Sequence, residues 1–347
     1  MLVDSPPEQR ADAAPAPPTR RAVRSLGLLV AVAALVLVAL ASIAIGAKEL
    51  SVDQVWHGLF HDTGTYGDVV VDERLSRTLL GLLAGAALGL SGAVLQALTR
   101  NPLADPGLLG INAGASAAVV TAITYLGVTS LSGYVWFAFV GAAAVGALVW
   151  FLGGSRGATP VRLALAGTAI SAALYGYLQA VMIMDDAALG RMRFWTVGSL
   201  SSATGSTIAQ VLPFLAAGTV LALLLARPLN ALAMGDDTAR ALGADLGRTR
   251  ALAMLAATVL CGAATAACGP IMFVGLMVPH AVRSFTGPDL RWILPYATVL
   301  SPVLLLGADV IGRMVARPAE LQVGVVTALI GGPVFILLVR RRRTARL

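Results

Sequence analysis

Few side chains in this chain of 347 residues could do chemistry, and their types decide which chemistry is open to it. His57, His61 and Asp62 lie close enough together to hold a metal ion, although isolated groups of this kind are more often only solvated. Lys48 is the only lysine, and the residues before it do not form the GxxxxGK[ST] loop that binds nucleotide phosphates. We therefore expect no site for ATP hydrolysis and no bound cofactor in this chain.

The remaining polar groups in apolar surroundings favour packing roles. Asp105 and Asp309 stand at the ends of apolar runs. A transporter coupled to protons or sodium usually carries carboxylates within its spans. The apolar runs of this chain contain none, so a transporter of that kind is disfavoured. Cys261 and Cys268 fall on one helical face, too far apart to bridge each other, and are expected to pack.

Small residues recur in the second apolar run. Gly81, Gly85 and Gly89 form a stripe along which another helix can approach closely. Gln96 and Gln179 could line a pathway, but hydrogen bonds between helices are the preferred interpretation.

The elements that position these residues are membrane helices. Of the residues, 57% are hydrophobic and 12% charged, and the mean hydropathy is +0.82, which is typical of a membrane protein. Two of the eight runs that lack Asp, Glu, Lys and Arg are divided, one near the Gly/Ser/Thr stretch 127–133 and the other at 268–270, which gives ten spans. The runs are 25–47, 78–99, 107–155, 163–184, 194–226, 251–282, 292–308 and 321–339.

Ten spans place both termini on one side of the membrane, and the basic residues indicate which side. On this assignment 18 of the 25 Lys and Arg residues lie on the side that holds the termini, so that side is predicted to be cytoplasmic. We expect a disordered, Pro- and Ala-rich cytoplasmic tail at 1–24, a permease domain at 25–340 and a basic cytoplasmic tail at 341–347.

Residues 74–116 read RLSRTLLGLLAGAALGLSGAVLQALTRNPLADPGLLGINAGAS. This stretch resembles, almost word for word, the signature of the FecCD family of permeases. Weaker similarities follow at 163–174 (LALAGTAISAAL), 269–283 (GPIMFVGLMVPHAVR) and 320–338 (ELQVGVVTALIGGPVFILL). Together they extend over nearly the whole chain, and the first stretch alone is specific.

The resemblance implies an all-α, polytopic permease of a type II ABC importer, with about ten transmembrane helices, in the bacterial inner membrane. The implied partners are a second permease, identical or paralogous, two cytoplasmic ATPases that use ATP and Mg²⁺, an extracytoplasmic binding protein and membrane lipid, with no nucleic acid. The implied cargo is a ferric siderophore or a related metal chelate, with cobalamin and haem as alternatives. A secondary transporter, or a membrane enzyme or scaffold, is a weaker alternative, because no ionisable relay or catalytic cluster is seen.

The family pattern also suggests a docking site on the outer face. It places arginines that receive acidic groups of the binding protein at Arg74, Arg77 and Arg313, and guanidinium groups bind carboxylates bidentately. Two alternatives stay open. The arginines could anchor helix ends at the membrane interface. Asp309, four residues before Arg313, could instead form an ion pair within one helix.

On the inner face, the loop 227–250 resembles the coupling helices of the family, which contact the ATPase. Gly235 and Gly243 divide it into short helical stretches, so a compact projection is expected. The residues predicted at the ATPase contact are Gly235, Ala239, Arg240, Leu242 and Gly243. The alternative is an ordinary basic cytoplasmic loop.

Overall fold

A computed structural model describes residues 20–60, 64–154 and 160–344, and its regular elements within these ranges are all helical. The helices are α1 (Arg20–Ala44), α2 (Val52–Phe60), α3 (Tyr66–Thr99), η1 (Pro106–Leu109), α4 (Ile111–Leu126), α5 (Leu131–Gly154), α6 (Pro160–Met184), α7 (Asp186–Trp195), α8 (Gly205–Leu224), α9 (Ala226–Ala233), α10 (Asp236–Ala241), α11 (Leu246–Cys268), α12 (Val274–Thr286), α13 (Leu290–Val315) and α14 (Val323–Thr344). The predicted all-α fold is confirmed. The predicted tail 1–24 lies mostly outside the described residues.

Seven of the described helices are long and apolar enough to cross a membrane: α1, α3, α5, α6, α8, α11 and α13. Two shorter apolar segments, in α4 and α14, accompany them. The structure therefore confirms a multi-pass membrane protein, while the expected number of about ten spans stays a prediction.

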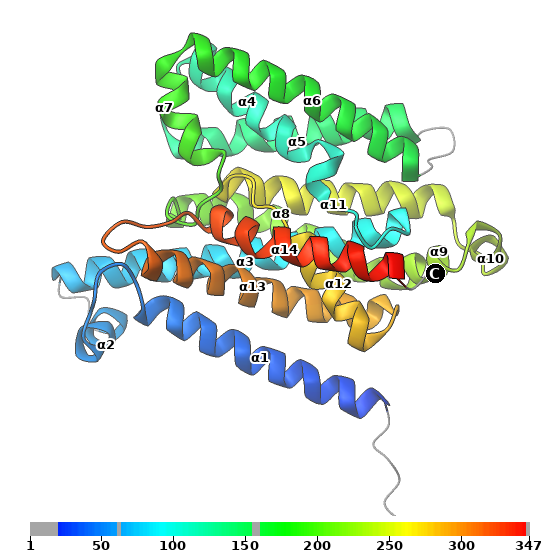
Figure 1. Cartoon of the computed structure of the whole chain (residues 1–347), viewed down its shortest axis with the longest axis horizontal. Helices are drawn as coiled ribbons and strands as arrows, with labels where there is room; N and C mark the ends of the chain where they lie inside the picture. Colours follow the sequence, from blue (N-terminus) through cyan, green and yellow to red (C-terminus); the bar gives the residue numbers. More distant parts are fainter. Residues whose placement is uncertain (1–19, 61–63, 155–159, 345–347) are drawn as a thin grey trace, which may run out of the picture.

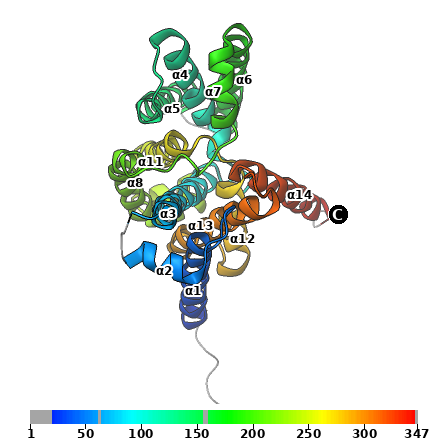
Figure 2. The ribbon, with the colours of Figure 1, turned by 90° about the vertical axis from the view of Figure 1, so that its left-hand side faces the viewer.

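The helices stack in layers about α3 and α11, as Figure 2 shows from the end of the bundle. α1 packs on α13, α13 on α3, and α3 on α11, while α8 and α5 pack on α11, and α4 and α6 lie beyond α5. α3 and α11 are the most deeply buried of the seven spans, and α1 is the least buried. The apolar surface that α1 leaves exposed is suited to lipid or to another membrane chain.

Both ends of the described chain lie at the same end of the bundle. The first turn of α1, the last turn of α14, α9 and α10 all lie at the right of Figure 1, and we call this the terminal end. α2, α7 and the segment 316–322 lie at the opposite end, the distal end.

One pass of the chain along the bundle is only partly helical. The break predicted at 268–270 occurs at Gly269, whose φ of +71° suits glycine and where an added Cβ would lie 2.2 Å from the carbonyl oxygen of Trp195. The chain then returns to the terminal end through the 13-residue α12, which ends near the start of α13. Short helices of this kind are tolerated at membrane depth where protein surrounds them.

The predicted glycine stripe of α3 packs against α13. A Cβ at Gly81 would lie 2.4 Å from Leu306 Cδ2, and one at Gly85 would lie 2.7 Å from Cα of Pro302. Gln96 donates hydrogen bonds to the carbonyl oxygens of Gly275 and Leu276, at 3.3 and 3.1 Å. Its interpretation as a link between helices is therefore confirmed, whereas Gln179 is exposed.

Two short distal helices add to the expected spans. α2 packs beside the first turns of α3 and exposes Trp56 and Phe60, whose ring centroids lie 4.6 Å apart. α7 begins after Asp185, whose carboxylate accepts hydrogen bonds from the N–H groups of Ala187 and Ala188. Both helices follow apolar runs closely, so a search for spans alone passes over them.

Candidate functional sites at the two ends of the bundle

At the distal end, two of the predicted arginines close the last turn of α1. Arg74 donates to the carbonyl oxygens of Ile43, Ala44 and Lys48, the first two at 3.0 and 2.9 Å. Arg313 donates to the carbonyl oxygens of Ser42 and Ile45 at 2.9 and 2.8 Å. The final carbonyl groups of a helix have no partners within it, so these guanidinium groups supply the missing donors where α1 ends.

The third arginine holds α3 to α13. Arg77 Nη2 and Asp309 Oδ1 lie 2.7 Å apart, and Arg77 Nε donates to both carboxylate oxygens of Asp309 at 3.1 and 3.0 Å. Asp309 also pairs with Arg313, four residues later, at 3.0 Å. The intrahelical pair left open as an alternative therefore forms. A single buried carboxylate lies between two guanidinium groups.

Glu320 connects this buried cluster to the surface. Arg77 Nη1 donates to Glu320 Oε2 at 2.6 Å, and the side chain of Glu320 is 35% exposed, against 10% for Arg77 and 1% for Arg313. The structure thus brings the predicted arginines together, but their guanidinium groups are buried and donate hydrogen bonds to oxygen atoms of this chain. That they receive carboxylates of a binding protein stays a prediction, and Glu320 is the member of the cluster that an approaching molecule meets first.

At the terminal end, the predicted projection is formed by α9 and α10. Gly235 separates the two helices with a φ of +112°, and Gly243 follows α10 with a φ of +79°. A Cβ at either glycine would meet no atom within 4 Å, so backbone conformation and not crowding requires glycine there. Ala239 is buried, whereas Leu242 is 62% exposed and Arg240 forms an exposed pair with Asp237. The predicted residues therefore lie together, with Leu242 and Arg240 open to contact.

Asp236, which is absent from the predicted contact residues, connects this projection to α3 and α11 by ion pairs. Its Oδ1 pairs with Arg100, at the end of α3, and its Oδ2 accepts a hydrogen bond from Nη2 of Arg250, near the start of α11, at 2.7 Å. The hydrogen bond from Arg250, followed by that from Arg100, lowers the pKa of Asp236 below its usual value. An acidic residue directly after a glycine, at the start of a short helix, is the available signal in the sequence.

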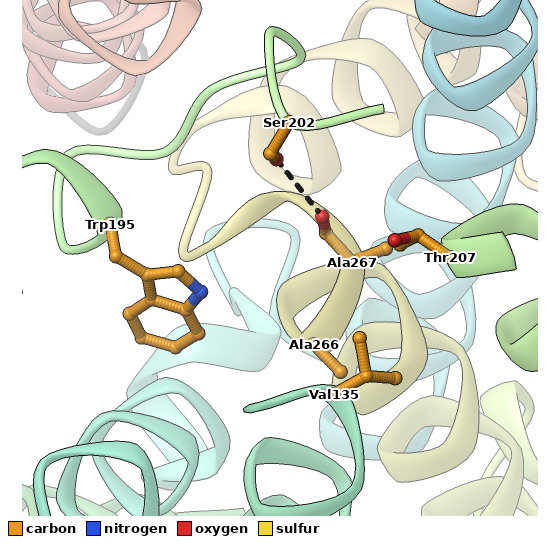
Figure 3. A pocket seen from close by; sticks show the side chains of 6 residues that line it. All are labelled: Val135, Trp195, Ser202, Thr207, Ala266 and Ala267. Carbon is orange, nitrogen blue, oxygen red and sulfur yellow. Dashed lines mark hydrogen bonds between the residues drawn. The ribbon is translucent and has the colours of Figure 1, made fainter. Parts of the chain in front are cut away.

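A small hollow lies beside the distal end of α11. Trp195, Val135, Ser202, Thr207, Ala266 and Ala267 line it (Figure 3). Ser202 Oγ donates across its edge to the carbonyl oxygen of Ala267 at 3.5 Å. Its enclosed volume of about 10 Å³ is far below the range that encloses a drug-sized ligand, so it does not suit a metal chelate.

No metal site emerges from the described part of the chain. Among the described residues, no three His, Cys, Asp or Glu side chains gather to hold an ion. His57 Nδ1 lies 3.5 Å from Asp53 Oδ1 on exposed α2, while His61 and Asp62 lie outside the described residues. Cys261 and Cys268 are buried as free thiols, as their spacing predicts.

Comparison with known proteins extends over almost the whole chain. A model of the FecCD transport family matches residues 34–341. The chain is 48% identical over 327 residues to the ferric enterobactin transport system permease protein FepD of Escherichia coli (strain K12), covering 93% of this chain and 96% of FepD. It is 39% identical to the hemin transport system permease protein HmuU of Yersinia pestis, covering 90% of this chain and 94% of HmuU.

A solved structure is also similar throughout. It shows an inward-facing conformation of an ABC transporter proposed to be of the metal-chelate type. The two chains are 28% identical, and the alignment has a TM-score of 0.80 while covering 91% of this chain and 99% of the other.

Proposed function

This chain belongs to the FecCD transport family, and we propose that it is the permease subunit of an ABC importer that carries ferric siderophores across the bacterial inner membrane. The observation that carries the proposal is the family match over residues 34–341, in a helical chain with seven candidate membrane spans. Iron chelates of several kinds are the named cargo of its relatives, and the 48% identical relative is a ferric enterobactin permease.

A haem chelate is the second candidate cargo. The 39% identical hemin permease of Yersinia pestis supports it. Cobalamin remains an alternative from the family resemblance alone. A secondary transporter gains no support, because the buried carboxylate of Asp309 is already paired with Arg77 and Arg313 and is poorly suited to relay protons.

We further propose ten crossings with the terminal end in the cytoplasm. α1, α3, α5, α6, α8, α11 and α13 would make seven of them, and α4, α12 and α14 the other three. The shared position of both ends of the described chain supports an even number. The excess of basic residues assigned to that end supports its orientation.

The partners follow from what this chain lacks. With a single lysine and no phosphate-binding loop, it depends on separate ATPases that use ATP and Mg²⁺, which we propose contact α10 and its flanking glycines. A second permease, identical or paralogous, would complete the path for the chelate between the two chains. Escherichia coli has two ferric enterobactin permease proteins, FepD and FepG, which are 48% and 38% identical to this chain and support a paralogous partner.

The binding protein is proposed to dock at the distal end, around Arg74, Arg77 and Arg313. Because these guanidinium groups are buried and already hydrogen-bonded, a carboxylate from the binding protein would first have to displace Glu320 from Arg77. Docking would then open the outer part of a cluster that also holds α1, α3 and α13 together. Docking of the binding protein at the surface would in this way change the contacts among α1, α3 and α13.

The decisive experiment is reconstitution of the transporter. The chain is co-expressed with the candidate ATPase, second permease and binding protein, and the purified complex is placed in proteoliposomes. We expect the ATPase to co-purify, and uptake of radioactive iron to require ATP and a ferric siderophore. Uptake of haem or cobalamin in place of the siderophore would reassign the cargo, and uptake without any ATPase would contradict the proposed class of transporter.

A further inference from the structure

α10 is held to the rest of the chain by few contacts. It has only six residues and packs mainly on α9 and α11. Ala239 is its one buried side chain. A helix so lightly attached needs some stronger connection if its displacement is to move the membrane helices and not merely itself.

Asp236 provides ionic connections in two directions. One carboxylate oxygen pairs with Arg100, which also donates from Nε to the carbonyl oxygen of Leu232 at 2.9 Å. The other oxygen pairs with Arg250 at 2.7 Å. The exposed fractions of the side chains are 33% for Asp236, 39% for Arg100 and 18% for Arg250, so the group is only partly screened by water.

The two arginines belong to the helices at the centre of the fold. Arg100 caps the end of α3 with a φ of +50°, and its backbone N–H donates to the carbonyl oxygen of Ala97. Arg250 is the fifth residue of α11. α3 and α11 are the most buried of the seven spans and pack on each other, so a force applied to both reaches the middle of the bundle.

We propose that Asp236 is the positioning residue through which a displacement of α10 by the ATPase is transmitted to α3 and α11. Its neighbour Asp237 points away from this group, is fully exposed and pairs only locally with Arg240 at 2.9 Å. Packing of α9 on α3 offers a second route, but it leaves α10 itself free to tilt. The inference rests on the proposed function, since it requires an ATPase to act on α10.

The test compares Asp236→Asn with the matched control Asp237→Asn in the full reconstituted transporter. Each variant loses one negative charge from adjacent positions of the same short helix, but only the first loses the connection to α3 and α11. Because α10 is the proposed ATPase contact, ATPase binding and ATP hydrolysis are measured in both variants, and any loss caused by the contact itself should be similar in the two. Chelate uptake per ATP hydrolysed should fall about tenfold in Asp236→Asn, within the usual range of coupling between sites, and should fall much less in Asp237→Asn.

Further variants separate the two connections and guard against misfolding. Arg250→Gln breaks the connection to α11 alone, and Arg100→Gln weakens that to α3, so each should lower uptake per ATP by less than Asp236→Asn does. Asp236→Glu keeps the carboxylate and should recover most of the coupling. Equal uptake per ATP in Asp236→Asn and Asp237→Asn would overturn the inference, as would loss of ATPase binding in Asp236→Asn, which would make Asp236 part of the contact itself. If no ATPase binds the unmodified chain, the proposed function itself fails.

Discussion

Arg77 and Asp309 lie 232 positions apart in the chain, yet two nitrogen atoms of the guanidinium group donate to both oxygens of the carboxylate. Asp309 is completely buried and is also paired with Arg313. The buried positive charges of Arg77 and Arg313 thus share this one carboxylate, with Glu320 as a partly exposed second acceptor for Arg77.

Asp309→Asn should therefore destabilise the protein strongly. It leaves two buried guanidinium groups without their shared counterion, a loss that costs about 3–5 kcal/mol when one partner of a buried pair is removed. Thermal unfolding of the detergent-solubilised chain would measure it. Asp237→Asn, at an exposed pair, is the control and should change stability by less than about 1 kcal/mol. Similar melting temperatures for the two variants would show that the cluster is dispensable.

Glu320→Ala separates docking from stability. The change frees Nη1 of Arg77 while keeping the pair with Asp309, so a carboxylate of the binding protein no longer has to displace a resident one. We expect the binding protein to bind the complex in nanodiscs about fivefold more tightly, the gain expected from one partly exposed pair. Unchanged affinity would argue that the binding protein does not contact Arg77.

How far the sequence predicts this protein depends on whether the deciding interactions are local. The break at Gly269, the stripe at Gly81 and Gly85, and the projection between Gly235 and Gly243 are predictable because glycine marks a local backbone requirement. The pairing of Arg77 with Glu320 is not, because it joins residues 243 positions apart whose proximity only packing creates.

The same reasoning applies to the direction in which the distal arginines point. Arginines at helix ends in a membrane protein suggest an outward-facing cluster, whereas Arg74 instead turns to the last carbonyl groups of α1. The need of these carbonyl groups for a hydrogen-bond donor cannot be predicted from the sequence around Arg74. It is met because α1 ends beside α3, where Arg74 reaches the last carbonyl groups of α1.

Gly92→Ala tests the close approach of α3 and α12. A Cβ at residue 92 would lie 1.9 Å from the carbonyl oxygen of Gly275, which is backbone and cannot move aside without shifting α12. We expect a loss of about 1–3 kcal/mol in stability, as for other overpacked sites. Gly176→Ala, at a helical glycine where an added Cβ would meet no atom within 4 Å, is the control and should be neutral or slightly stabilising. Comparable losses in both variants would contradict the packing.

Asp289 should make stability depend on acid pH. It precedes the span of α13, and hydrogen bonds chiefly from Arg291, then from the backbone of Arg291 and from Asn230, lower its pKa from 3.8 to about 2. The carboxylate form is favoured in the folded state, so its contribution is fully present above about pH 4 and is lost as pH falls towards 2. The melting temperature of Asp289→Asn should consequently fall less than that of the unmodified chain between about pH 5 and pH 2. Parallel pH curves would exclude this role.

Gly243→Ala tests whether the conformation after α10 serves the ATPase contact. The φ of +79° costs a residue with a Cβ roughly 1–2 kcal/mol, and the space around it is open, so the strain is relieved by moving the adjoining chain and not by disturbing the core. Membrane insertion should remain normal, because the spans are untouched. Leu242 and Arg240, which are exposed at the proposed contact, should shift with the turn. We therefore expect uptake per ATP to fall several-fold in the reconstituted transporter.

Gly247→Ala is the matched control, since Gly247 lies within α11 and a Cβ there would make only an ordinary contact with Asp245 at 3.5 Å. If Gly243→Ala couples hydrolysis to uptake as well as Gly247→Ala does, the left-handed turn is not needed for the contact.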